Sequence, residues 1–133
     1  MMIEINNLTT LSGVDKKFLK GVAKTILKGE NTKEAGLSVV LVSSGRIKKL
    51  NKKYRGKNKI TDVLAFGEGL NEIVICPSEV KKNAKKYNIA FKKELARVLI
   101  HGILHLSGYE HEVSEKKARE MERKQEFYLS QII

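Results

Sequence analysis

The sequence lacks the features that mark secreted, disulfide-stabilised and membrane-spanning proteins. Cys76 is its only cysteine, which excludes an internal disulfide framework. No apolar stretch approaches the roughly 20 residues that a transmembrane helix needs, and the first ten residues lack the basic-then-apolar pattern of a signal peptide. We therefore expect a cytoplasmic protein with no membrane partner and no disulfide partner. Cys76 has no nearby ligand partner in the sequence and fits a small buried residue at a strand end.

Positive charge is abundant and unevenly distributed. The 133 residues carry a formal net charge of +11, and the segment from position 46 to position 59 contains eight basic residues and no acidic one. These eight are Arg46, Lys48, Lys49, Lys52, Lys53, Arg55, Lys57 and Lys59. Such clustering favours a polyanionic partner, with nucleic acid the leading candidate. A lysine-rich surface that is merely solvated is the alternative.

The hydrophobic pattern predicts one domain over residues 1–133, with a hydrophobic fraction of 41% that is ordinary for a globular chain. Strands are expected at 2–6, 36–43, 61–66 and 72–75, the last two as a hairpin or sheet pair. Helices are expected at 12–29, 43–55, 77–87, 91–107 and 114–130. Ser12 is a candidate N-cap, and Tyr54 and Phe127 are expected to pack inward. The result is a mixed sheet covered by helices.

The most informative stretch is HGILHLSGYEH, which contains all three histidines, His101, His105 and His111. On a helix, His101 and His105 lie on one face about one turn apart and can share a metal ion. Gly108 can adopt the positive φ that turns the chain, so that His111 can supply a third ligand. Each histidine alone fits an ordinary polar side chain. Together, in this register, they predict a Zn²⁺ site with a fourth position open to water.

The residue after the first histidine separates two chemistries. Zincin peptidases have a glutamate there, and it acts as the general base. Here the position is Gly102, and the peptidase base is missing. We therefore expect hydrolysis of a bond other than the peptide bond, with a zincin-like metallopeptidase as the alternative.

Three stretches together resemble one family. HGILHLSGYEH is similar to its motif HGxLHLxGYDH, LNKKYRGKNKITDVLAF to L-N-x-x-Y-R…T-D-V-L-S-F, and NEIVICPSEVKKNA to its G-D-I-x-I…A segment. The chain thus resembles the YbeY endoribonucleases from about Leu37 to Glu122. It departs from the family pattern at Ile60, Ala65, the pair Asn71-Glu72, and Glu110, which stands where the family has aspartate.

The resemblance implies a single α+β domain with a four-stranded mixed sheet and one Zn²⁺ per chain, held by His101, His105 and His111. It implies single-strand-specific cleavage of RNA, maturation of small-subunit ribosomal RNA and ribosome quality control, with the small ribosomal subunit as partner. It also implies that Arg55 faces the metal cleft and contributes to activity, which suits a guanidinium facing phosphate charge. A non-catalytic ribosome-assembly factor with a structural zinc is a further alternative.

Two neighbouring positions have more than one interpretation. Asp62 can orient a ligand histidine by accepting a hydrogen bond from it, or it can cap a helix or strand. Tyr54 can stack on a base, although inward packing on helix 43–55 is the expectation.

Overall fold

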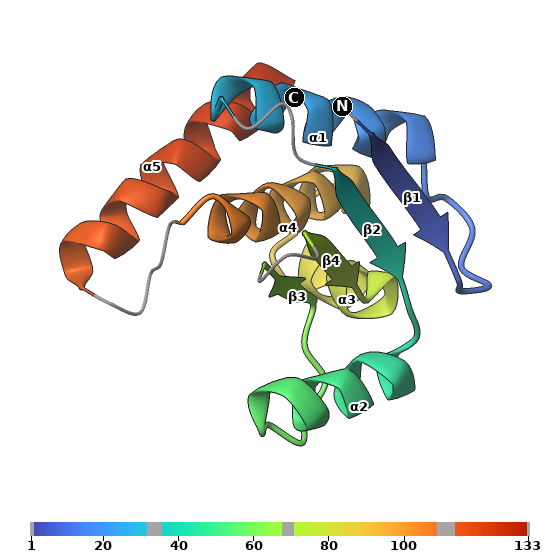
Figure 1. The fold of residues 1–133 in the computed structure, drawn as a ribbon. Coiled ribbons are helices and arrows are strands. Elements are labelled where there is room, and N and C mark those ends of the chain that lie inside the picture. Colours follow the sequence, from blue (N-terminus) through green and yellow to red (C-terminus); the bar gives the residue numbers. More distant parts are fainter. Residues whose placement is uncertain (1, 32–35, 68–70, 109–113, 133) are drawn as a thin grey trace.

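A computed structural model describes residues 2–31, 36–67, 71–108 and 114–132 of the chain. Four strands and five helices follow one another in the described part (Figure 1). The strands are β1 (Ile3–Asn7), β2 (Leu37–Leu41), β3 (Val63–Phe66) and β4 (Glu72–Ile75). The helices are α1 (Lys16–Gly29), α2 (Ser44–Arg55), α3 (Pro77–Lys86), α4 (Phe91–Leu106) and α5 (Glu115–Ile132). No helix of the described residues is long and apolar enough to cross a bilayer.

The strands form one mixed sheet in the order β1-β2-β4-β3. β1, β2 and β4 run parallel, whereas β3 pairs antiparallel with β4, with Leu64 opposite Val74. The predicted pairing of segments 61–66 and 72–75 is therefore confirmed, although the first strand begins only at Val63. The α+β class and the four-stranded mixed sheet are confirmed as well.

Both faces of the sheet are covered, because successive strand residues point to opposite sides. On β4, Ile73 and Ile75 join the main core with α1 and α4, while Val74 joins a smaller cluster under α2. Leu64 of β3 and Ile47 of α2 belong to that same smaller cluster. Figure 1 accordingly shows α1 and α4 on one side of the sheet and α2 on the other. The predicted burial of Cys76, directly after β4, is confirmed.

The helix that carries the histidine motif lies against the sheet through its apolar side. Leu95, Leu99 and Ile103 of α4 are buried as the helical period predicts. Helix α4 also contacts α3 and α5, so it is central to the fold. The helix ends at Leu106, Ser107 is its C-cap, and Gly108 has φ +99°, the positive φ that the sequence predicts. The two histidines of α4 are thereby fixed on a well-packed element.

Three local expectations are wrong. Helix α1 starts at Lys16 and is capped by Asp15, whose carboxylate accepts the Phe18 backbone N–H at 3.0 Å, not by Ser12. Tyr54 and Phe127 are 57% and 53% exposed, although inward packing was expected of both. Tyr54 lies against the side of the Phe66 ring of β3, edge to face, and its own ring remains at the surface.

Candidate functional site

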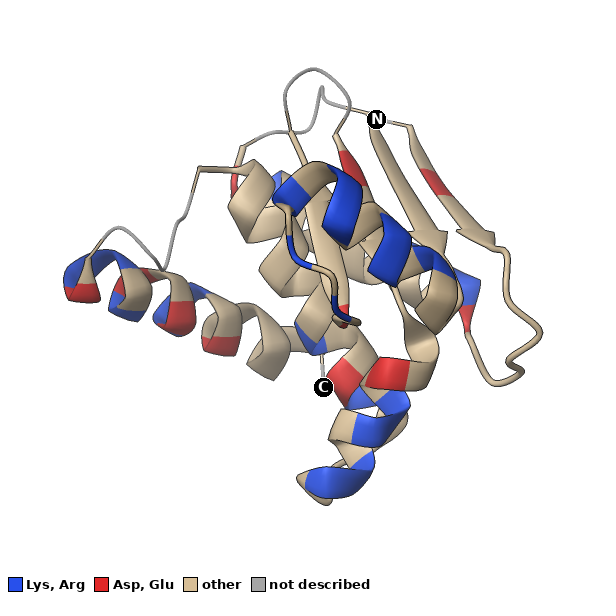
Figure 2. Cartoon of the chain, turned by 90° about the horizontal axis from the view of Figure 1, so that it is seen from below, with Lys and Arg blue, Asp and Glu red and all other residues tan. Residues whose placement is uncertain are grey.

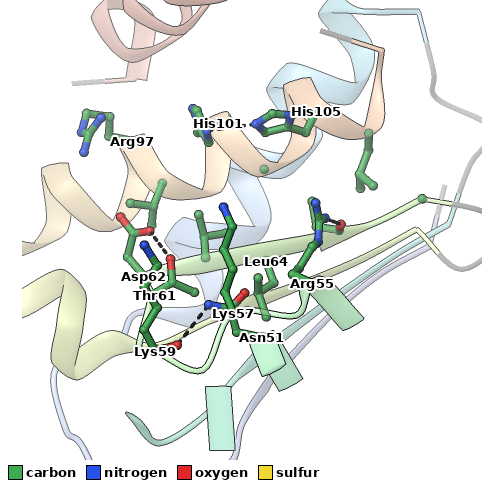
Figure 3. Close-up of a pocket in the computed structure, with 16 residues that line it drawn as sticks. Asn51, Arg55, Lys57, Lys59, Thr61, Asp62, Leu64, Arg97, His101 and His105 are labelled. Atoms are coloured by element: carbon green, nitrogen blue, oxygen red, sulfur yellow. Dashed lines mark hydrogen bonds between the residues drawn. The ribbon is translucent and has the colours of Figure 1, made fainter. Parts of the chain in front are cut away.

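A pocket of about 650 Å³ lies between α4 and the segment that joins α2 to β3. Two walls of different origin face one another across it (Figure 3). The polar side chains that line it include Arg55, Lys57, Lys59, Asp62, Arg97, His101 and His105. Residues about 50 positions apart in the sequence thus meet in one cavity, and its charge is mainly positive.

His101 and His105 meet on the α4 wall of the pocket. Their Nε2 atoms are 3.1 Å apart, and their rings lie at 78° with centroids 4.7 Å apart. The one-turn spacing therefore brings the two ring nitrogens to one point, as the motif predicts. His111, the third predicted ligand, lies outside the described residues, as does Glu110.

Gln125 of α5 orients the first histidine, a role that the sequence analysis missed. Its Oε1 lies 2.9 Å from Nδ1 of His101. A carbonyl oxygen only accepts, so Nδ1 carries the proton and Nε2 keeps its lone pair toward His105. Metal-binding histidines usually have such a partner on the second ring nitrogen. Asp62, the candidate from sequence, instead pairs its carboxylate with the Thr61 hydroxyl at 3.5 Å.

A signal for Gln125 existed in the helical period of α5. Met121, Gln125, Tyr128 and Leu129 are its buried residues, so a glutamine occupies a position on an otherwise apolar stripe. A polar side chain buried in this way needs a partner, and here the partner is the histidine ring. The donor set of two convergent imidazoles, one with its proton fixed on the remote nitrogen, fits a metal ion that prefers nitrogen ligands.

Close packing of α4 on the sheet favours a small residue at position 102, which is Gly102. A Cβ added there would lie 3.2 Å from two side-chain carbons of Ile73, closer than ordinary packing. A glutamate at this position, as zincin peptidases require, would force the fully buried Ile73 side chain to shift by a few tenths of an ångström. The absence of the peptidase base thus coincides with close packing of helix on strand.

Arg55 faces His101 and His105 from the opposite wall, at the last residue of α2. Its Nη2 donates to the Ala65 carbonyl of β3 at 2.7 Å. Its guanidinium lies 6.0 Å from the centroid of the Phe66 ring. Gly56 follows with φ +70°, so the helix ends there and the chain turns along the pocket rim. Arg55 is therefore anchored by one donor, and its other donors remain for a ligand.

Asn51 holds the loop beside Arg55. It is 3% exposed, and its Nδ2 donates to the Lys59 carbonyl at 3.0 Å. Lys57 and Lys59 both line the pocket, so this hydrogen bond helps to fix two cations at its rim. This hydrogen bond of the side-chain amide explains why a polar residue is buried on the inner side of α2.

Arg97 brings a second guanidinium to the pocket, one turn before His101. Its Nε and Nη2 donate to the two carboxylate oxygens of Glu94 at 2.7 and 2.6 Å, a bidentate pair. The Glu94 side chain is 0% exposed and that of Arg97 34%. The hydrogen bonds that Arg97 donates to Glu94 raise the pKa of Arg97; burial lowers it, and the charges of Glu94 and Asp62 raise it further. Arg97 is thus permanently charged at the cavity wall.

The predicted basic run divides into two groups. All eight residues are exposed, and Figure 2 shows their charge along α2 and the loop that follows it. Arg55, Lys57 and Lys59 line the pocket. The remaining members lie on α2 away from the lining: Arg46, Lys48, Lys49, Lys52 and Lys53. The basic surface is therefore continuous in sequence with the pocket rim.

Comparisons with known proteins point in one direction. The model of a family described as endoribonuclease YbeY matches residues 4–133. A protein named endoribonuclease YbeY from Thermotoga neapolitana is 42% identical over 125 residues, which are 90% of this chain and 84% of that protein. One of the same name from Thermotoga maritima is 42% identical over 118 residues, covering 86% and 78%. A solution structure of a Thermotoga maritima protein superposes with a TM-score of 0.71 at 40% identity, covering 98% of this chain and 89% of that one.

Proposed function

The chain belongs to the endoribonuclease YbeY family, and from this membership we propose that it cleaves single-stranded RNA at the pocket between α4 and β3. One observation carries the proposal: two imidazoles converge on α4 while an anchored arginine faces the same cavity. Two imidazoles whose ring nitrogens converge can bind a metal ion, and a guanidinium can bind a phosphate. A metal-dependent nuclease can use both.

The metal is proposed to be Zn²⁺, one per chain, held by His101, His105 and His111. The fixed proton on Nδ1 of His101 supports this, because it leaves Nε2 as the ligand atom. Bound zinc supplies Lewis acidity, which acidifies a water molecule or polarises a phosphate oxygen. Gln125 keeps the first ring in the orientation that this binding needs.

The chain's cations are proposed to hold the RNA and to meet the charge that develops on it. Whether a water molecule or the RNA 2′-hydroxyl attacks, negative charge builds on the phosphate oxygens. Arg55 presents planar donors to that charge and is already oriented by Ala65. Lys57, Lys59 and Arg97 line the same cavity and attract the neighbouring phosphates.

The biological substrate is proposed to be ribosomal RNA in the cytoplasm, with the small ribosomal subunit as partner. Support comes from the sequence resemblance and from the exposed basic run on α2, which suits a large polyanion better than a small substrate. The role would be maturation of small-subunit RNA and quality control of ribosomes.

Two alternatives are separated from this function by direct assays. A zincin-like peptidase shares the histidine spacing, but its general base is missing because Gly102 occupies that position, packed closely on Ile73. A non-catalytic assembly factor with structural zinc would bind ribosomes without cutting RNA.

The test compares substrates with and without chelator. Purified protein is incubated with single-stranded RNA, duplex RNA and casein, before and after chelation, alongside His105→Ala. We expect cleavage of single-stranded RNA only, lost with chelator and in the variant. Digestion of casein would support the peptidase, and metal binding and ribosome binding without any RNA cleavage would support the assembly factor.

A further inference from the structure

An exposed aromatic ring directly precedes the anchored arginine and contacts Phe66, whose two chain neighbours line the pocket. Tyr54 is 57% exposed, contrary to the inward packing expected from sequence. Its ring meets Phe66 edge to face, with centroids 5.3 Å apart and an interplanar angle of 69°. Phe66 itself packs against the smaller core cluster under α2. Tyr54 is therefore exposed yet supported by a partly buried ring that packs against the core.

This ring is adjacent to the proposed phosphate-binding groups. Tyr54 precedes Arg55 directly, and Phe66 lies between Ala65 and Gly67, which both line the pocket. The ammonium of Lys53 is 5.2 Å from the Tyr54 centroid. The exposed ring thus has one cation, Lys53, against it and a second, Arg55, next to it in the chain. An aromatic face suits a base, and the neighbouring cations suit its phosphates.

We propose that Tyr54 is a stacking platform for one unpaired nucleobase of the RNA whose phosphate lies at Arg55. The inference rests on the proposed function and specifies how that site selects its substrate. Every base has a π face, so the platform binds bases without strong sequence preference. The cations at Lys53 and Arg55 then hold the backbone on either side of the stacked base.

The platform gives a physical origin for single-strand preference. In a duplex, each base is already stacked and paired, and its face is not available to a protein ring. In a single strand, a base can turn outward and lie on Tyr54 while its phosphate enters the pocket. Loss of the ring should therefore weaken the binding of single-stranded RNA much more than the binding of duplex RNA.

The chain provides a matched control at Tyr87. This tyrosine is 61% exposed and has the ammonium of Lys86 5.5 Å from its ring centroid, close to the values for Tyr54. It lies at the end of α3 and, unlike Tyr54, has no chain neighbour that lines the pocket. Any effect of removing an exposed ring beside a lysine is shared by the two positions, whereas a stacking role at the pocket belongs to Tyr54 alone.

The experiment is a cycle between protein variants and abasic substrates. Single-turnover cleavage is measured with metal-loaded protein and single-stranded oligoribonucleotides, each with one abasic nucleotide at successive positions around the cut. The quantity compared is the protein concentration that gives half the maximal rate. The variants are Tyr54→Ala, Tyr54→Phe and Tyr87→Ala. Alanine is a good helix former, so α2 should keep its structure, which equal metal content and melting temperature would verify.

At one substrate position, removal of the base should raise the half-saturating concentration of the wild type about five-fold or more. Tyr54→Ala should raise it equally on intact RNA and show no further rise on that abasic substrate. Tyr54→Phe and Tyr87→Ala should behave as wild type. Equal losses for Tyr54→Ala and Tyr87→Ala, or an undiminished Tyr54→Ala effect on every abasic substrate, would overturn the stacking role alone. A wild type that cleaves no single-stranded RNA would overturn the proposed function and this inference together.

Discussion

Replacing Arg55 with alanine should slow RNA cleavage far more than it weakens RNA binding. Arg55 donates one hydrogen bond to the Ala65 carbonyl at 2.7 Å, and this hydrogen bond orients the guanidinium before RNA binds. A donor that is already oriented toward developing charge stabilises the transition state without reorganisation. Seven other cations of the 46–59 segment remain in the variant, so ground-state attraction of RNA is largely preserved.

The expected loss follows from comparison with other preorganised donors. Removal of one such donor costs roughly 10²- to 10³-fold in rate, or about 3–4 kcal/mol of transition-state stabilisation. Arg55→Ala should therefore cleave roughly 10²-fold or more slowly while binding RNA within about a few-fold of wild type. Arg55→Lys should rescue only part of the rate, because a point charge cannot both bond Ala65 and present a planar fork.

Single-turnover cleavage at saturating protein is the assay, with Lys52→Ala as the matched control. Lys52 lies on the same helix, is exposed and does not line the pocket. Its removal should weaken binding slightly and leave the saturated rate near normal. Equal saturated rates for Arg55→Ala and Lys52→Ala would refute the reasoning and make Arg55 part of the general basic surface.

Further predictions concern stability, metal affinity and salt. Arg97→Met leaves the fully buried carboxylate of Glu94 without its bidentate partner, and urea denaturation should show a loss of about 3–5 kcal/mol in unfolding free energy. Glu94→Gln should lower the unfolding free energy by less, because the Arg97 side chain is 34% exposed and stays hydrated without its partner. An equal or larger loss would contradict this asymmetry. Gln125→Leu should weaken metal binding by about 10- to 100-fold in chelator competition, and unchanged affinity would mean that the contact with His101 does not orient the ligand. Single-stranded RNA affinity should fall with salt at a logarithmic slope of about −0.7 per phosphate contact, whereas a flat response would leave the 46–59 segment as solvated surface. Metal should dissociate below about pH 6 as the imidazoles gain protons, measured as metal content after gel filtration, and retention at pH 4 would argue against histidine ligands.

Much of the fold followed from periodic patterns in the sequence. The apolar period of α4 predicts that Leu95, Leu99 and Ile103 face the core, and all three are buried. The same period placed His101 and His105 on one face. These features are local, because helix geometry relates residues one turn apart whatever the rest of the fold does.

What the sequence did not predict depends on contacts between distant segments. The bond between His101 and Gln125 joins residues 24 positions apart on two helices. The burial of Asn51 depends on the carbonyl of Lys59 in a loop, a partner that the helical period does not reveal. The start of α1 was misplaced because both Ser12 and Asp15 are good caps, and only the folded chain distinguishes them.

The most direct test of the central claim is a zinc titration of the metal-free protein, with cleavage of single-stranded RNA as the readout. If His101 and His105 hold the ion beside the phosphate-binding arginine, the rate should rise from zero and reach its plateau at about one equivalent of metal. The folded double variant His101→Ala, His105→Ala should stay inactive throughout the same titration. Full cleavage by the chelated protein, or restoration of cleavage in the double variant, would contradict the account.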